Sequence, residues 1–293
     1  MLHVLFVVAL SLWLTLPALS AQKDALTEAG KRLHSELKGE FRTLRDFPRE
    51  TVLNYDATGR LKSKSDPSPW TLSGRIKVKR VEATPGNLHI EAERYLVVFK
   101  GRYGEEQTNQ RTHETVVIEA DLPPSAGVSD LHKLVDAIFI PEPELLNHLP
   151  EFWRDYLQQS ERVRQFRESP EGAHEDGMPG STRTTNVSAD PSLPVRIHQA
   201  QAEQLLVHSE IPDYPLDVRA VRVEGSVVLD VRVDTSGRVA ELHLVKPLGA
   251  GLDDEAAEAI SQWTFHTLAV GGMPREFLTY IRVNFTIRKE RLK

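Results

Sequence analysis

Cysteine is absent from the 293 residues of this sequence. Its absence excludes disulfide bonds, thiolate catalysis, cysteine-ligated zinc or iron–sulfur sites, and the lipid-bearing cysteine of a bacterial lipoprotein. The sequence also lacks an excess of basic charge, because 36 Lys and Arg stand against 42 Asp and Glu, for a formal net charge of -6. This balance provides no electrostatic basis for holding a phosphate backbone, so we expect no nucleic-acid partner.

The usual signatures of catalysis and cofactor binding are missing as well. There is no Gly-x-Ser-x-Gly, His-Glu-x-x-His or phosphate-binding Gly-Lys motif, and Gly249–Gly251 lacks the third glycine of a dinucleotide fingerprint. The eleven histidines are scattered rather than spaced as metal ligands. The acidic run Asp253–Glu255 is explained more simply by a place in the first turn of a helix. We therefore expect a protein that is not an enzyme and binds no cofactor or metal.

One long hydrophobic run is present, at the amino terminus. Residues 2–21 carry no charged side chain, and the run closes with the small residues that follow Pro17. Such an ending is typical of a signal-peptidase site, although the length of the run also suits a membrane-spanning helix. The sequence predicts export, with residues 1–21 either removed as a signal peptide or retained as an anchor.

Residues 22–167 predict a β-rich amino-terminal domain that closes with helices. Apolar residues three or four apart favour a short amphipathic helix after residue 23, and Asp130 is placed to cap a helix over 131–138. Residues 145–166 carry aromatic side chains at helical spacing, which we interpret as the buried side of a helix. Four stretches are rich in β-branched and aromatic residues and are separated by turn formers, which is typical of strands. They are residues 51–55, 70–81, 88–99 and 115–122.

Residues 168–195 differ in composition from both flanks. Seven of their residues are proline or glycine, between Pro170 and Pro194, and few are apolar. This composition predicts a flexible linker that separates the first domain from a carboxy-terminal domain at residues 196–293.

Beyond the linker, apolar and polar residues alternate over 227–233 and again over 239–245, with a turn at Asp234–Gly237 between them, which predicts a β-hairpin. Asp253 then offers an N-cap for a helix with one apolar face. That face is formed by Leu252, Ala256, Ile260 and Trp263. Alternation returns over 281–287 as a final strand. The expected fold is α+β, with this domain a two-layer ββαβ unit whose sheet edges can accept an extended peptide.

The ordered motifs of this domain resemble the carboxy-terminal domain of the TonB family over about residues 205–288. They are Leu205–Pro215, Val223–Val227, Val233–Val239, Leu252–Ala256, Gln262–Phe265 and Arg282–Phe285. The resemblance implies a periplasmic domain that grips the TonB box of an outer-membrane receptor by strand addition and passes on force from inner-membrane motor proteins. By the same resemblance, Pro212, Tyr214 and Pro215 match the receptor-contacting motif. The strand over 279–288 matches the one that receives the box, and its contact residues are Arg282, Asn284, Thr286 and Arg288.

Departures from the family pattern leave two functions open. Ile211 stands where the family motif has Gln, the leader has no Ser-x-x-x-His pattern, and no long proline-rich rod is present. One hypothesis is a partner of an outer-membrane receptor in energy-coupled transport. The other is a periplasmic scaffold for envelope assembly that uses a TonB-like domain without energy coupling. A homodimer is compatible with either hypothesis.

Overall fold

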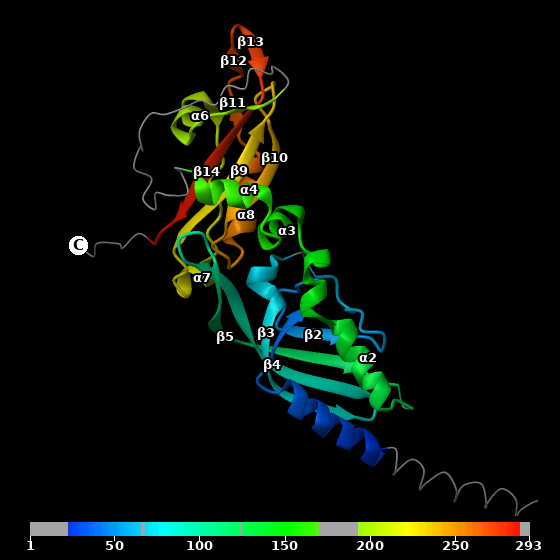
Figure 1. Ribbon diagram of the computed structural model, residues 1–293. Coiled ribbons are helices and arrows are strands. Elements are labelled where there is room, and N and C mark those ends of the chain that lie inside the picture. The colour runs from blue at the N-terminus through cyan, green and yellow to red at the C-terminus, as the bar shows by residue number, and fades with distance from the viewer. Residues whose placement is uncertain (1–22, 66–67, 124, 170–192, 288–293) are drawn as a thin grey trace, which may run out of the picture. The chain divides into compact units, whose positions relative to one another are not determined.

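The computed structural model describes residues 23–65, 68–123, 125–169 and 193–287 (Figure 1). The expected signal peptide, most of the expected linker and Arg288 lie outside these residues. The mixed α+β class expected from the sequence is confirmed. The chain divides into an amino-terminal unit, residues 1–96 and 111–145, and a carboxy-terminal unit, residues 97–110 and 146–293. Among the described residues, no helix combines the length and apolarity needed to cross a membrane.

A six-stranded sheet with the order β2-β5-β4-β3-β1-β6 forms the amino-terminal unit. Its strands are β1 (Phe41–Leu44), β2 (Val52–Tyr55), β3 (Arg75–Thr84), β4 (Asn87–Lys100), β5 (Glu106–Asp121) and β6 (Phe139–Ile140). The sheet is mixed, because β2 runs parallel to β5 while β1 pairs antiparallel with both β3 and β6. A short π-helix, η1 (Trp70–Gly74), lies between β2 and β3 in the chain, and a 3₁₀ helix, η2 (Glu142–His148), follows β6.

A helix over residues 23–37 and α2 (Val128–Ile138) provide the apolar side chains that fill the core of this unit. Leu26 and Leu33 from the first helix and Leu131 from α2 are buried in one cluster with Ile76 and Ile90 of the sheet. The apolar spacing read from the sequence therefore marks the buried sides correctly. The expected cap is wrong: α2 begins after Gly127, whose N–H donates to the Asp130 carboxylate at 3.0 Å, so Asp130 lies inside the first turn.

The carboxy-terminal unit is built on a four-stranded sheet with the order β10-β9-β14-β7. Its strands are β7 (Val195–Arg196), β9 (Gly225–Val233), β10 (Val239–Lys246) and β14 (Phe277–Phe285). The β9–β10 turn needs Gly237, whose φ is 83° and whose added Cβ would lie 1.9 Å from the Phe265 carbonyl oxygen. Two short ladders join β8 (Leu206–His208) to β11 (Thr264–Phe265) and β12 (Leu268–Val270) to β13 (Met273–Arg275). Helices α6 (Gln199–Leu205) and α7 (Leu216–Ala220) lie between β7 and β9 in the chain.

Helix α8 (Leu252–Ser261) packs against β9 and β10 with Leu252, Ala256 and Ile260 buried, as its apolar spacing predicts. Two expectations about this helix are wrong. The N-cap is Gly251 rather than Asp253, because the Asp253 carboxylate turns back to accept the N–H groups of the preceding loop. Trp263 was expected on the buried face of this helix, but it lies beyond the end of the helix and is only half-buried.

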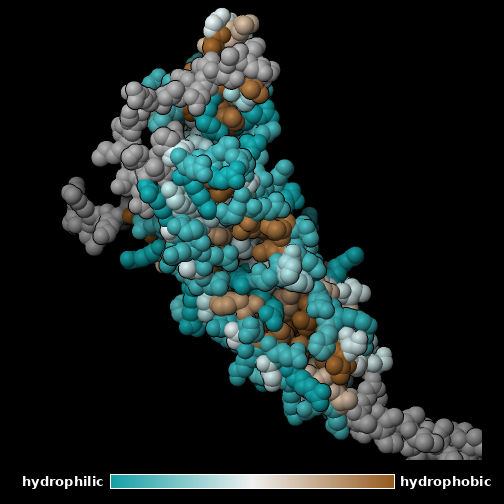
Figure 2. Space-filling model, viewed as in Figure 1, coloured by the Kyte–Doolittle hydropathy of each residue, from teal (hydrophilic) through white to brown (hydrophobic). Residues whose placement is uncertain are grey.

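Two helices before the expected linker, α3 (Glu151–Leu157) and α4 (Glu161–Glu168), pack on the carboxy-terminal sheet. Phe166 of α4 is buried in one cluster with Val228, Val245 and Tyr280, and its ring centre lies 5.1 Å from that of Tyr280. The outer surface of α4 is mainly hydrophilic, as expected for a helix that turns its apolar side to a sheet (Figure 2). The sequence placed these helices in the amino-terminal domain. Helical spacing shows that a side is buried but not which sheet buries it.

Residues 97–110, the far ends of β4 and β5 with their turn, also belong to the carboxy-terminal unit. The Phe99 N–H donates to the Leu248 carbonyl at 2.9 Å, and the Ala250 N–H donates to the Val97 carbonyl at 2.8 Å. An added Cβ on Gly249 would lie 2.1 Å from that same Val97 oxygen, so the close approach requires glycine. The Gly249–Gly251 segment is thus explained by packing. The domain boundaries at residues 167 and 196 stay a prediction, because residues 170–192 are outside the described part of the chain.

Candidate peptide-binding site

The outer edge of β14 is the backbone surface to which the sequence assigned peptide binding. On its inner side β14 pairs antiparallel with β9 from Phe277 to Phe285. On its outer side the carbonyls of Glu276 and Leu278 accept N–H groups from the β7 segment at 2.9 Å. Because backbone groups alternate between the two sides of a strand, those of Arg282 and Asn284 also face outward. In the described residues β7 pairs only with Phe277 and Leu278, so no strand pairs with the outer edge beyond that point.

Side chains at this edge differ in their surroundings. Asn284 is exposed, and the Arg282 guanidinium donates to the Ser226 hydroxyl of β9 at 3.0 Å. Thr286 is exposed just past the end of the strand, and the next N–H, that of Ile287, donates to the Glu224 carboxylate at 2.6 Å. Arg288 lies outside the described residues. The structure therefore brings Arg282, Asn284 and Thr286 to one edge, whereas their role in binding stays a prediction.

The predicted contact motif lies at the end of this same strand. Pro212, Tyr214 and Pro215 are half-buried in the segment that leads into α7, and Pro215 is the N-cap of that helix. The Tyr214 ring meets Phe285 of β14 edge-on at 5.4 Å, and its hydroxyl donates to the Val223 carbonyl at 2.5 Å. Burial raises the pKa of Tyr214, which keeps the hydroxyl a donor. The motif and the strand edge are far apart in sequence, and they meet where Tyr214 packs on Phe285.

Exposed aliphatic side chains flank the motif. Val207 is 58%, Ile211 91% and Leu216 75% exposed. Sequence reasoning noticed Ile211 only as a departure from the family pattern and did not single out the other two. Their apolar character was readable, but their exposure depends on the packing of the segment.

Trp263 holds this segment through its indole. The Nε1–H donates to the Glu210 carbonyl at 2.9 Å, and the ring centre lies 6.4 Å from that of Phe265. Because the side chain is half-buried, we expect Trp263→Ala to lower the free energy of unfolding by about 2 kcal/mol, below the 3–5 kcal/mol typical of a core aromatic. Urea unfolding measures the loss. Trp263→Phe, which keeps most of the ring packing, should lose about half as much, and a loss above 4 kcal/mol for alanine would place the indole in the core.

Two carboxylates at the start of α8 lie in an unusual environment. Asp253 is fully buried, and it accepts the N–H groups of Leu248 and Gly249 at 2.8 and 2.7 Å. Burial raises its pKa to about 6, against the lowering effect of these two hydrogen bonds. Burial and the neighbouring Asp253 raise the pKa of Asp254 to about 7, and Asp254 accepts the Trp153 indole N–H at 3.4 Å. Among the described residues no group of three or more His, Cys, Asp or Glu is placed to hold a metal ion.

The raised pKa of Asp253 predicts a pH-dependent stability. The folded state holds this proton up to about pH 6, whereas the unfolded chain releases it near pH 3.8, so stability is lost as the pH rises between these values. Relative to the wild type, Asp253→Asn should therefore gain about 2 kcal/mol of unfolding free energy from pH 4 to pH 7. Urea titrations of both proteins across this range measure the difference. A difference that does not change with pH would show that Asp253 ionises normally.

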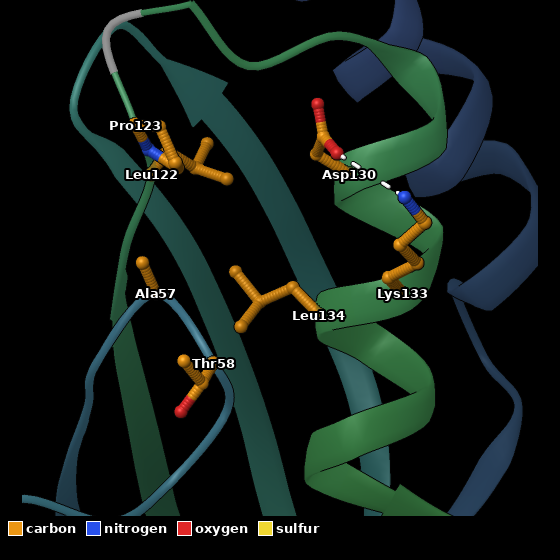
Figure 3. A pocket seen from close by; sticks show the side chains of 7 residues that line it. All are labelled: Ala57, Thr58, Leu122, Pro123, Asp130, Lys133 and Leu134. Carbon is orange, nitrogen blue, oxygen red and sulfur yellow. Dashed lines mark ion pairs between the residues drawn. The ribbon is translucent and has the colours of Figure 1, made fainter.

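A shallow hollow of about 230 Å³ lies in the amino-terminal unit, between α2 and the end of β5 (Figure 3). Leu122 and Leu134 are among the apolar residues that line it, and the ammonium of Lys133, another lining residue, lies 3.6 Å from the Asp130 carboxylate. The volume is below the range of typical small-molecule sites, and none of the predicted site residues lines it.

Comparison with known proteins bears on the carboxy-terminal unit. Residues 210–287 match the family model described as Gram-negative bacterial TonB protein C-terminal. Protein TonB of Vibrio cholerae serotype O1 is 29% identical over 106 residues, which cover 33% of this chain and 43% of that protein. The solution NMR structure of Pseudomonas aeruginosa TonB CTD is 22% identical, covers 29% of this chain and 88% of that chain, and has a TM-score of 0.25.

The resemblance read from the sequence is thus confirmed, and the chain carries a TonB-like carboxy-terminal domain. The match spans less than half the length of the curated Vibrio relative.

Proposed function

We propose that this protein acts in TonB-type transport across the cell envelope, binding the TonB-box peptide of an outer-membrane receptor along the outer edge of β14. The observation that carries the proposal is that, in the described part of the chain, no strand pairs with the outer edge of β14 beyond Leu278, and that this edge lies beside a motif within the family match. An extended peptide gains main-chain hydrogen bonds at such an edge without any catalytic group.

Peptide contacts are assigned to two neighbouring surfaces. The backbone groups of Arg282 and Asn284 pair with the peptide, and the family resemblance assigns Thr286 and Arg288 to the same contact. Pro212, Tyr214 and Pro215 contact residues that flank the paired strand. The exposed Ile211 and Leu216 add apolar area on this side, which favours a peptide or receptor surface with aliphatic groups.

The proposed place of action is the periplasm. Residues 2–21 supply the export signal, and contact with inner-membrane motor proteins requires either that this run stays uncleaved or that an anchored partner is present. The mature amino terminus, read by mass spectrometry of protein from an envelope extract, distinguishes a signal peptide from an anchor.

Binding of receptor peptides tests the proposal. Fluorescence polarisation with labelled TonB-box peptides from outer-membrane receptors of the same cell should show saturable binding to residues 22–293. Peptides of the same composition in scrambled order serve as the control, because strand addition needs side chains that suit alternate positions as well as a backbone. Absence of binding up to millimolar peptide would overturn the receptor-binding function and favour a scaffold without receptor contact.

A further inference from the structure

The chain itself occupies part of the proposed peptide edge. The N–H groups of Val195 and Ile197 donate to the carbonyls of Glu276 and Leu278, each at 2.9 Å, in the parallel β7–β14 ladder. Where this ladder stops, a side chain continues it: the Gln199 Oε1 accepts the Arg282 N–H at 3.2 Å. These are backbone groups that an added peptide strand would use.

Side chains seat this segment specifically. Val195 is 0% and Ile197 4% exposed, so both bury their aliphatic groups. Between them Arg196 makes two hydrogen bonds, of 2.9 and 3.0 Å, to the buried Asp230 carboxylate of β9. Its guanidinium also lies 4.5 Å from the centre of the Tyr280 ring. A bidentate charged pair together with a cation–π contact fixes both position and register.

Gln199 is oriented for its contact. Its amide nitrogen donates to the Glu203 carboxylate at 2.9 Å, one turn further along α6, which leaves the oxygen directed at Arg282. An amide oxygen placed on a strand N–H reproduces the hydrogen bond that a peptide carbonyl would make there. The side chain therefore stands in for one residue of an added strand.

We propose that residues 195–199 are an internal competitor for the peptide edge of β14. This inference rests on the proposed function and names the regulation of the same site. A partner peptide has to displace the Gln199 amide from Arg282, and it has to release β7 if it is to pair as far as Glu276. Because the competitor is tethered beside the edge, its effective concentration is high. Only peptides that bind well enough to outcompete it gain the full length of the strand.

The first test removes the side-chain competitor alone. Gln199→Ala should bind a receptor TonB-box peptide about three- to ten-fold more tightly than the wild type, the effect of one neutral hydrogen bond. The Arg282 amide should also exchange its proton faster, by a similar factor, in nuclear magnetic resonance spectra of the peptide-free protein. Gln204→Ala, an exposed position on the same helix, is the matched control and should leave both readouts unchanged.

The second test uses the chain's own segment as the probe. A labelled synthetic peptide with the sequence of residues 193–201 should bind the Val195→Ala/Ile197→Ala double variant of the full chain at least about ten-fold more tightly than the wild type. The double variant keeps the backbone but loses aliphatic burial, so the tethered copy leaves the edge more often. An excess of unlabelled peptide of the same sequence should displace the probe.

The outcomes separate this inference from the proposed function. Receptor peptides that bind the wild type and all variants equally would overturn the inference while the function stands. A segment peptide that fails to bind the folded double variant, with no change in Arg282 exchange in Gln199→Ala, would also overturn it. If no receptor peptide binds but the segment peptide behaves as expected, the function falls and the internal occupation of the edge stands.

Discussion

Phe166→Ala lowers the free energy of unfolding of the carboxy-terminal unit by an expected 3–5 kcal/mol. The Phe166 ring is 1% exposed, and it meets Tyr280 edge-on at 5.1 Å and Tyr103 at 6.5 Å. Removing it leaves a cavity against β9 and β10, because Val228 and Val245 are held in the sheet and cannot move in to fill the space. Urea unfolding of the full chain, followed by near-ultraviolet circular dichroism, measures the loss.

Gln165→Ala is the control for this change, because Gln165 is on the exposed side of α4 and bonds only within the helix, to Glu161 at 3.1 Å. A surface substitution of this kind should change stability by less than about 0.5 kcal/mol. Equal, small effects at both positions would show that α4 does not pack on the sheet in solution. The expected result also implies that a fragment beginning at residue 196 exposes apolar groups of the sheet and is less stable than the unit with α3 and α4.

Asn284→Pro should weaken the binding of a TonB-box peptide by roughly 30- to 1000-fold. Proline has no N–H, so the carbonyl of the added peptide loses its donor, and the ring projects into the space that the peptide backbone needs. The inward ladder to β9 uses the neighbouring odd-numbered residues, so an edge proline at this position is tolerated better than one at Val283. Fluorescence polarisation with the full chain measures the affinity.

Two controls accompany the proline variant. Asn284→Ala keeps the N–H and removes only an exposed side chain, so its affinity should stay within about three-fold of the wild type. Circular dichroism and Tm must show that Asn284→Pro is folded. Undiminished binding to a folded Asn284→Pro would move the peptide away from this edge, and the Pro212–Pro215 segment would be the next surface to test.

Local periodicity determined much of the carboxy-terminal domain. The alternation over 227–233 and the apolar spacing of Leu252, Ala256 and Ile260 are patterns of neighbours along the chain, and each reports which side of one element is buried. The ordered motifs added the TonB resemblance and, through it, the predicted contact residues Tyr214 and Asn284. The buried side of each element and the family motifs could be predicted because both depend on residues close together in the sequence, and not on what each element packs against.

Partners distant in sequence were decided only by the tertiary structure. The aromatic side of α3 and α4 could have been buried by either sheet, and the choice of the carboxy-terminal one depends on matching surfaces rather than on spacing. The spacing predicted that Trp263 would be the fourth apolar residue on the buried face of α8. The helix ends at Ser261, however, and the Trp263 indole N–H donates to the Glu210 carbonyl. Pairing of β7 with β14, and with it the occupation of the peptide edge by Gln199, joins residues about 80 positions apart. Such pairing is set by the three-dimensional arrangement of backbone donors and acceptors, which no local pattern encodes.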